Sequence, residues 1–354
     1  MPSHGRVRLL AKYSPGEVLH YQIEMNNVSK GKSGGLVEDP EAASQLKQST
    51  SVLVRLDVLA VNPSAPSKSA SEKSGSGSDA PAATTKPASE KSATAATTDA
   101  SARDAAATAG TRIKVTYEKS DASIQSDAYD ENAQNLVDQY RKLQGQSLEF
   151  TLGPDGRVGH LAGLDKVLAD PSAAATAQGW MSNISPAGGF PKRGIEVGEK
   201  WKSEEKLLGA PLKGTVWRAE STYLRDEPCT LGSPHTPGLA AASASGPAPQ
   251  ETTPTPPTDS CAVVLTHFKI LQTDPTDNLT PPAYAKAGLV MAGSWLGEGE
   301  SLSHISLRTG FVVSVTQRAT QQMDFTISTH TADTRLTYTG EVTSQTEIQL
   351  LDTH

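Results

Sequence analysis

Features that would mark a nucleic-acid-binding protein or a membrane-spanning protein are missing from this sequence of 354 residues. The net charge is −7, and no cluster of lysine and arginine with interleaved aromatics occurs, which argues against a basic nucleic-acid surface. No apolar run approaches the roughly 18 residues that span a membrane. The start, MPSHGRVRLLAKY, lacks the apolar segment of a signal peptide. A cytoplasmic location does not follow, because Met1 can stand before a mature chain.

Motifs for catalysis, metal binding and phosphate binding are also missing. Residues 31–33 read Gly-Lys-Ser, but a phosphate-binding loop needs its first glycine at the position of Asn26. No G-x-S-x-G turn occurs, so no serine nucleophile is marked. None of the eight histidines stands in an H-x-H, H-E-x-x-H or zinc-type Cys/His spacing. We therefore predict no catalytic residue, no metal ligand and no cofactor.

Two local arrangements keep a chemical alternative open. Glu298 and Glu300 are two residues apart, which places both carboxylates on one face of a strand. A calcium-ligand pair or an acid/base pair is conceivable, and a solvated hairpin edge is the favoured interpretation. His267 and His304 lie in predicted strands and can approach each other within a sheet. Ordinary strand histidines are the favoured interpretation there.

Two tracts have too few large apolar residues to fold. The first, at about 62–110, is almost entirely Ala, Ser, Thr, Lys, Asp and Pro, and the second, at about 231–260, is rich in Pro, Ala, Ser and Thr. Neither buries enough apolar surface to offset the entropy of ordering the chain. We predict two disordered insertions. The first is best explained as an enlarged hairpin loop, because loop length costs little free energy.

The chain has only two cysteines, and they flank the second tract. Cys229 ends the strand-like stretch WRAESTYLRDEPC, and Cys261 begins the strand CAVVLTHFKIL. If these strands pair as neighbours, the two sulfurs meet at the mouth of the inserted loop. We predict a disulfide, and with it an oxidising compartment. Two unrelated buried thiols are the alternative.

Alternating hydrophobicity dominates the rest of the chain and predicts β-strands. Leu148, Phe150 and Leu152 alternate with polar residues, a Gly-Pro-Asp-Gly turn follows at 153–156, and Val158 resumes the pattern. We interpret this hairpin as the centre of the domain. Short connections with Gly or Asp then predict an antiparallel meander that curves. Its strands are expected at 215–224, 262–271, 288–296, 301–307, 311–318, 323–330 and 335–350.

Two helices are predicted. Residues 131–144 place Val137, Tyr140 and Leu143 at helical spacing, and Gly145 is a suitable C-cap. A second helical stretch runs from 163 to about 184 and is interrupted by a proline. The predicted fold class is mainly β: a curved antiparallel sheet or half-barrel with two helices packed on its concave side.

The chain is predicted to consist of two halves. Residues 1–190 form an N-terminal β-rich half with the helices, and residues 191–354 form a C-terminal antiparallel meander. SLEFTLGPDGRVGHL in the first half and SHISLRTGFVVSVTQ in the second both read as strand, glycine turn and strand. Either the halves are duplicated or the two hairpins are merely alike.

Three short motifs carry a resemblance to a known family. They are a Y-x-x-G turn (Tyr13, Gly16), an F-x-L-x-x-x-G-x-V hairpin beginning at Phe150, and a V-G-x-x-W element ending at Trp201. Their order resembles a family of bacterial exported proteins, many of them lipoproteins, that is defined as a domain of unknown function. Such chains are similar to the half-barrels of LolA- and LppX-type lipid carriers. The resemblance implies a hydrophobic cavity and supplies no catalytic residue, and the lipobox cysteine of lipoproteins is absent here.

The functional prediction is a non-enzymatic, periplasmic or extracellular protein that binds a hydrophobic or amphipathic ligand, or another envelope component, without nucleic acid and without a membrane span. Tryptophans in a curved sheet either line such a pocket or fill a core. The predicted pocket lining is Phe150, Val158, Trp180, Trp201, Trp217 and Trp295. One alternative is a structural or assembly subunit that docks a partner by a sheet edge. Another is a hydrolase whose residues meet only in three dimensions.

Overall fold

The computed structural model describes fifteen parts of the chain, between which lie segments outside the description. The described residues are 5–34, 43–62, 110–127, 131–153, 156, 158–162, 180–181, 183–184, 189–206, 212–231, 259–272, 280–281, 285, 288–329 and 335–353. The two predicted disordered insertions fall almost entirely outside them, so those predictions stay predictions.

The described chain forms one antiparallel sheet of eleven strands. The strands are β1 (Val18–Gly34), β2 (Ala43–Asn62), β3 (Gly110–Ser126), β4 (Ser147–Leu152), β5 (Val158–Ala162), β6 (Lys200–Lys206), β7 (Thr215–Pro228), β8 (Ser260–Gln272), β9 (Leu289–Ser306), β10 (Val312–Thr329) and β11 (Arg335–Thr353). Their order is β5-β4-β3-β2-β1-β11-β10-β9-β8-β7-β6. The first and last strands therefore pair in the middle, and the sheet is open between β5 and β6.

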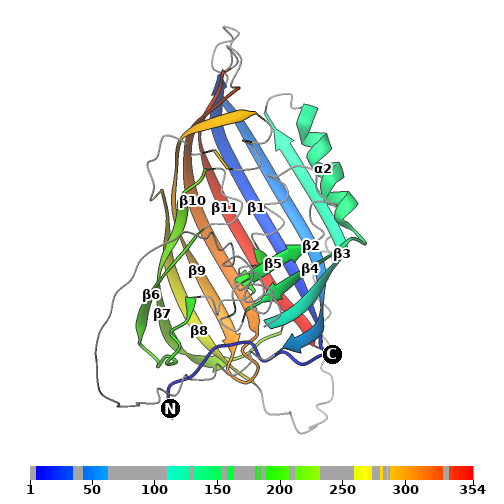
Figure 1. Cartoon of the computed structure of the whole chain (residues 1–354), viewed down its shortest axis with the longest axis vertical. Helices are drawn as coiled ribbons and strands as arrows, with labels where there is room; N and C mark the ends of the chain where they lie inside the picture. The colour runs from blue at the N-terminus through cyan, green and yellow to red at the C-terminus, as the bar shows by residue number, and fades with distance from the viewer. Residues whose placement is uncertain are drawn as a thin grey trace, which may run out of the picture.

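The sheet is strongly curved. In Figure 1 the long central strands run lengthwise through the molecule, while β6 and β7 at one edge and β3, β4 and β5 at the other flank them. Long twisted strands in an antiparallel sheet of this size coil in this way. The predicted mainly β, antiparallel architecture is confirmed.

The prediction of two helices is not matched, because the described residues contain one helix, α2 (Glu131–Leu143). Its buried side chains Val137, Tyr140 and Leu143 keep the predicted helical spacing and pack against β3. Of the second predicted helix, little is described. Trp180 and Ile184 there are buried in the main core. Trp180, Met181 and Asn183 have helical geometry, and Ile184 N donates to Trp180 O at 3.3 Å, while residues 163–179 lie outside the described part of the chain.

The main core lies toward the lower end of the sheet in Figure 1 and is closed by segments between the strands. Leu9, Ile195 and Phe311 pack against strand residues such as Ile23. Tyr21 is also buried there, and its hydroxyl donates a hydrogen bond to Val312 O at 2.9 Å. Burial raises the pKa of Tyr21 well above its usual range, so the phenol stays a neutral donor.

Cys229 and Cys261 form a disulfide, as predicted. Their Cα atoms are 5.0 Å apart, and Cys229 N donates to Asp259 O at 2.8 Å. The bond joins the chain just after β7 to the start of β8, at the base of the second tract. The two hairpins of similar sequence occupy different places, because β4 and β5 lie at an edge while β9 and β10 lie inside the sheet. The predicted division into halves stays a prediction.

Candidate functional site

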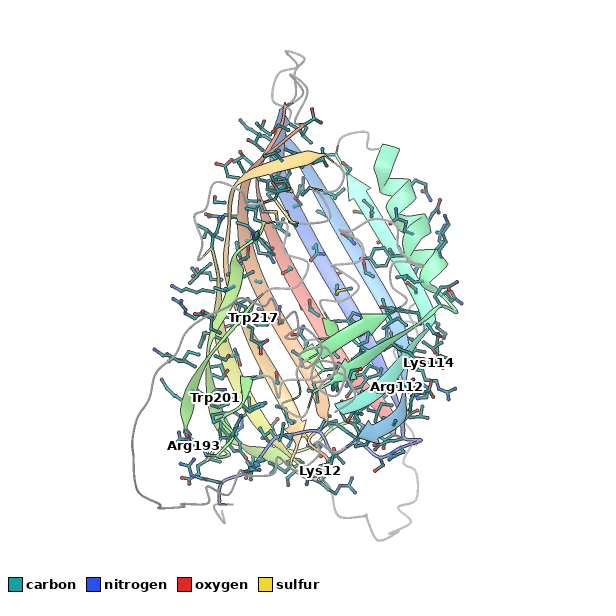
Figure 2. The ribbon with its side chains drawn as sticks, viewed as in Figure 1. Lys12, Arg112, Lys114, Arg193, Trp201 and Trp217 are labelled. Atoms are coloured by element: carbon teal, nitrogen blue, oxygen red, sulfur yellow. A yellow bond between two sulfur atoms is a disulfide. The ribbon has the colours of Figure 1, made fainter. Side chains whose placement is uncertain are left out.

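The sheet has two faces of opposite character, because side chains alternate between the faces along each strand. We call the face that bears Ile23 and Ile348 the inner face, since the core segments and α2 pack against it. The opposite face, which bears Glu24 and Glu347, is the outer face. Figure 2 shows side chains such as Arg112 projecting outward from the sheet.

Beyond the main core the inner face becomes polar and uncharged. Gln317 is aligned with Ser301, Ser301 with Thr266, and Thr266 with Ser221, so one row of polar side chains crosses four strands. The Ser221 and Thr266 hydroxyls are 2.9 Å apart. Together with the adjoining strands these positions form the polar belt, defined as Asn27, Gln48, Thr50, Ser221, Thr266, Ser301, Gln317, Ser344 and Thr346.

Above the polar belt, the inner face carries a second apolar cluster. Leu212 and Met291 are buried, and Trp295, Phe325 and Ile327 are half-buried around them. We call these five residues the apolar patch. It is a separate cluster from the main core. Two neighbours extend it: Tyr338 stacks on Phe325 at a ring distance of 5.3 Å, and Trp295 Nε1 donates to Gln321 Oε1 at 3.1 Å.

Glycines let two aromatic rings lie flat on the inner face. A Cβ at Gly299 would lie 2.5 Å from Phe268 Cζ, and a Cβ at Gly340 would lie 2.7 Å from the Tyr338 hydroxyl. The Tyr338 hydroxyl reaches Ser29 Oγ at 2.8 Å. Each aromatic ring therefore lies over a glycine, and the surface there is formed by the ring instead of by a second side chain.

The six predicted pocket residues are distributed over three clusters. Phe150, Trp180 and Trp201 belong to the main core, and Val158 packs against it. Trp217 lies with Phe268 in a small cluster, at a ring distance of 4.7 Å. Trp295 belongs to the apolar patch. Figure 2 shows Trp201, which lies on the edge strand β6, and Trp217, which lies on the adjoining strand β7.

Several polar atoms of the inner face are buried without a hydrogen-bond partner among the described residues, and two of them lie in or near the polar belt. These two are Trp217 Nε1, a donor, and Gln317 Oε1, an acceptor. Buried polar groups are normally paired, because an unpaired one costs about 1–3 kcal/mol. Sequence reasoning missed Gln317 and the patch residue Phe325. Gln317 and Phe325 are an even number of positions apart on β10, so their side chains point to the same face of the sheet. This spacing is the sequence signal that would have placed them together.

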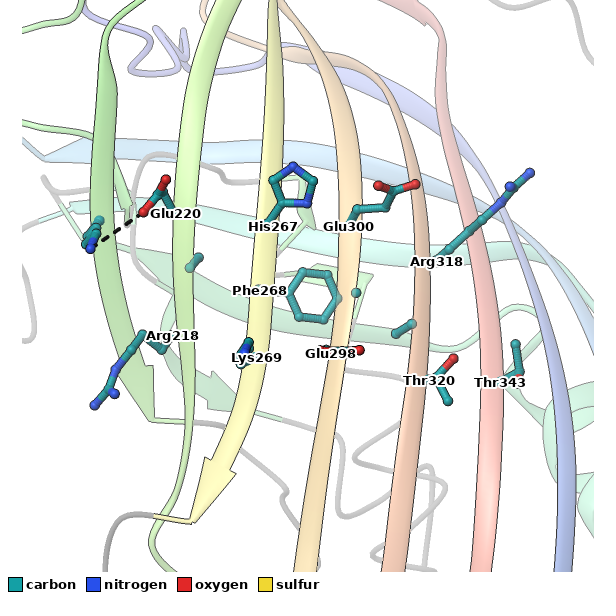
Figure 3. A pocket seen from close by; sticks show the side chains of 14 residues that line it. Arg218, Glu220, His267, Phe268, Lys269, Glu298, Glu300, Arg318, Thr320 and Thr343 are labelled. Carbon is teal, nitrogen blue, oxygen red and sulfur yellow. Dashed lines mark ion pairs between the residues drawn. The ribbon is translucent and has the colours of Figure 1, made fainter.

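The outer face has a depression of about 790 Å³ with a different lining. Figure 3 shows the charged side chains that project into it from neighbouring strands. Glu220, His267, Glu300 and Arg318 form one aligned row. Among the described residues no group of His, Cys, Asp and Glu is placed to hold a metal ion. Acidic and basic side chains interspersed across a water-facing sheet are typical of a solvated surface.

The outer face also carries a hydrogen-bonded group of Glu227, His304 and Ser314, which no sequence motif predicted. His304 Nε2 lies 2.7 Å from Glu227 Oε1, and His304 Nδ1 lies 3.0 Å from Ser314 Oγ. Burial alone would raise the pKa of Glu227, but hydrogen bonds from Arg225 and His304 outweigh it and lower that pKa. The carboxylate is therefore held ionised. The three side chains come from β7, β9 and β10, and only strand register brings them together.

Comparison with known proteins identifies no family for this chain. No protein-family model matches it, and a search of curated proteins finds no match. Among solved structures it is similar to lipovitellin, in a structure described as showing lipid–protein interactions, with a TM-score of 0.43 and 9% identity. That match covers 97% of this chain and 26% of the other, so the chain spans about a quarter of its length.

A second similar structure is an outer membrane channel from Pseudomonas putida F1. The TM-score is 0.18 at 7% identity, and the match covers 96% of this chain and 97% of the other. Neither structure is a LolA-type carrier, so that predicted resemblance is not confirmed. No helix in the described part of the chain is long and apolar enough to cross a membrane.

Proposed function

We propose that the protein is a non-enzymatic binding protein that holds an apolar or amphipathic small molecule on the inner face of its sheet. One observation carries the proposal: the apolar patch is a cluster separate from the main core, in which the side chains of Trp295, Phe325 and Ile327 are only half-buried. Covering such side chains is favourable by about 25 cal/mol for each Å² of apolar surface removed from water. A ligand lying on the patch supplies that cover.

Location is part of the same proposal. The disulfide between Cys229 and Cys261 supports residence in an oxidising compartment, periplasmic or extracellular, since such bonds are rare in reducing cytosol. The outer face is polar and charged along the strands that carry the patch, as Glu298 and Arg318 illustrate. A protein with an apolar molecule bound on its inner face would therefore still present a polar, charged outer face to water.

Binding of N-phenyl-1-naphthylamine, an uncharged apolar probe that fluoresces in apolar surroundings, tests the proposal. Trp295→Ala should weaken its binding by about fivefold or more, because loss of a contacting aromatic costs more than about 1 kcal/mol. Leu296→Ala is the matched control. Leu296 is the next residue of β9, is 44% exposed, and lies on the outer face.

The control variant should bind the probe as the wild-type protein does. Equal weakening by both variants, or no binding by the wild-type protein, would refute the proposal. Far-UV circular dichroism and urea unfolding establish that Trp295→Ala remains folded, so that lost binding is not mistaken for lost structure.

Docking of a partner through a sheet edge receives less support. β6 is one edge, and it carries Lys200, Lys202 and Glu204 on its outer side. Charged side chains, lysine above all, discourage the pairing of an edge strand with another chain.

Ester hydrolysis at Ser314 is a second candidate, favoured by the hydrogen bonds that link Ser314, His304 and Glu227. His304 would accept the hydroxyl proton as Ser314 attacks an ester carbonyl, and Glu227 would hold the protonated ring. The ester C–O bond would then break, His304 would give the proton to the leaving alcohol, and water would hydrolyse the acyl-serine. The lining of the outer-face depression does not include these residues. Turnover of p-nitrophenyl acetate tests this candidate: activity that Ser314→Ala removes would support it, and activity that survives the substitution would refute it.

A further inference from the structure

The inner face is almost free of charge. Its positions on β1, β2, β7, β8, β9, β10 and β11 hold no Asp, Glu, Lys, Arg or His beyond the main core. Glu205 on the edge strand β6 is the one charged side chain that shares this face among those strands and β6. The next residues along the same strands are often charged, for example Glu300 beside Ser301 and Arg318 beside Gln317. Apart from Glu205, the charged side chains of these strands beyond the main core are therefore confined to the outer face.

A charged group is poorly accommodated on such a face. An ion that leaves water needs a counter-charge or several hydrogen bonds, and otherwise loses several kcal/mol. A hydroxyl or amide group has a smaller requirement, which neutral side chains can meet. The polar belt offers both hydroxyls and amides, and it includes the unpaired acceptor Gln317 Oε1, while Trp217 Nε1 nearby is an unpaired donor.

We propose that the inner face selects an uncharged amphipathic molecule, with a hydroxyl- or amide-bearing head group on the polar belt and a hydrocarbon chain on the apolar patch. The inference rests on the proposed binding function and names the chemical class of its ligand. Belt and patch lie at successive levels of the same strands: Gln317 in the belt and Phe325 in the patch both face inward from β10. An extended ligand can therefore contact both along one strand direction.

Competition among three molecules with the same hydrocarbon chain tests the selection. They are 1-monolauroylglycerol, which is neutral, laurate, which is an anion, and dodecyltrimethylammonium, a cation. Each molecule is added to the full-length, unreduced protein with N-phenyl-1-naphthylamine bound, at concentrations below those at which it forms micelles. The loss of probe fluorescence measures how tightly the added molecule binds. We expect the neutral molecule to bind at least about tenfold more tightly than either ion, a difference of about 1.4 kcal/mol.

Equal or tighter binding of either ion would overturn the selection while leaving the binding function intact. Failure of the probe and all three molecules to bind would refute the binding function itself. Displacement by none of the three, with the probe still bound, would overturn the selection, because the site would then accept no amphipathic chain.

A charge placed on the inner face should change the preference. Gln317→Lys adds a cation in the polar belt and should favour laurate over monolauroylglycerol by about tenfold relative to the wild type. Thr316→Lys is the control, because Thr316 is exposed on the outer face of the same strand. If Gln317→Lys fails to fold, Gln321→Lys and its outer-face neighbour Gln322→Lys repeat the comparison. An unchanged preference in the inner-face variant, or an equal change in its control, would overturn the proposal.

Discussion

Gly299 shows how one missing side chain shapes the inner face. A Cβ there would crowd the backbone oxygen of Arg318 and lie 2.5 Å from Phe268 Cζ. Gly299→Ala should therefore destabilise the protein by about 1–3 kcal/mol, the usual cost of overpacking. Gly297→Ala is the control, because its nearest contact, to Thr320 O, would be 3.0 Å. Urea unfolding of the two variants gives the comparison, and equal losses would contradict this account of Phe268.

Glu227 provides a prediction that depends on pH. Its pKa is lowered in the folded protein, so its hydrogen bonds stabilise the fold above the ordinary carboxyl pKa of 4.5 and are lost as pH falls through the lowered value. Glu227→Gln should cost up to about 1 kcal/mol at pH 7, because the group is partly exposed. The difference from wild type should disappear in strong acid. Urea unfolding at both pH values measures it, and a difference that persists in acid would contradict the ionised pairing.

At the scale of elements, the disulfide should stabilise the β7–β8 pair. Cys229 and Cys261 are separated by 32 positions, and closing a loop of that size is worth about 3–4 kcal/mol by restricting the unfolded chain. The double variant Cys229→Ser, Cys261→Ser should lose that amount in urea unfolding. Reductant should lower the stability of the wild-type protein and leave the double variant unchanged. Insensitivity of the wild type to reductant would contradict the prediction.

The connection between β2 and β3 should be replaceable. Asn62 and Gly110 are paired residues, so the ends of residues 63–109 already lie side by side. A short glycine-containing turn in their place should preserve the fold and change stability by no more than about 1–2 kcal/mol, because loop-closure entropy grows slowly with length. Circular dichroism and urea unfolding of the shortened chain test this, and loss of the β-sheet signal would show that residues 63–109 contribute to folding.

Elements with strong local patterns were predictable, and long-range register was not. The alternation around Phe150, the spacing of Val137, Tyr140 and Leu143, and the placement of the cysteines gave strands, α2 and the disulfide correctly. The pairing of β1 with β11 has no local signal, because it depends on which strands share a core. The candidate site depends on that pairing. The sequence therefore named individual tryptophans as pocket candidates, and it predicted neither the polar belt nor the apolar patch.

For the whole molecule, the pairing of the first strand with the last in the middle of the sheet decides which deletions the fold can tolerate. β11 has β1 on one side and β10 on the other, along nearly its full length. Its removal would expose two strand edges and the inner-facing Ile348, which is 1% exposed. The free-energy cost of the unpaired strand edges and the exposed core together exceeds the net free energy of unfolding of a typical domain, about 5–15 kcal/mol.

A chain that ends at Thr329 should therefore fail to fold, although it lacks fewer residues than the chain shortened between β2 and β3. Circular dichroism and size-exclusion chromatography of the two chains make the comparison. The expected result is a compact β protein for the internal deletion and an aggregated or unfolded chain for the truncation. A folded truncated chain would mean that the two parts of the sheet on either side of β11 are stable without it. That result would contradict the dependence of the fold on β11, but it would leave the proposed ligand site in place, because Gln317 of the belt and Phe325 of the patch lie together on β10.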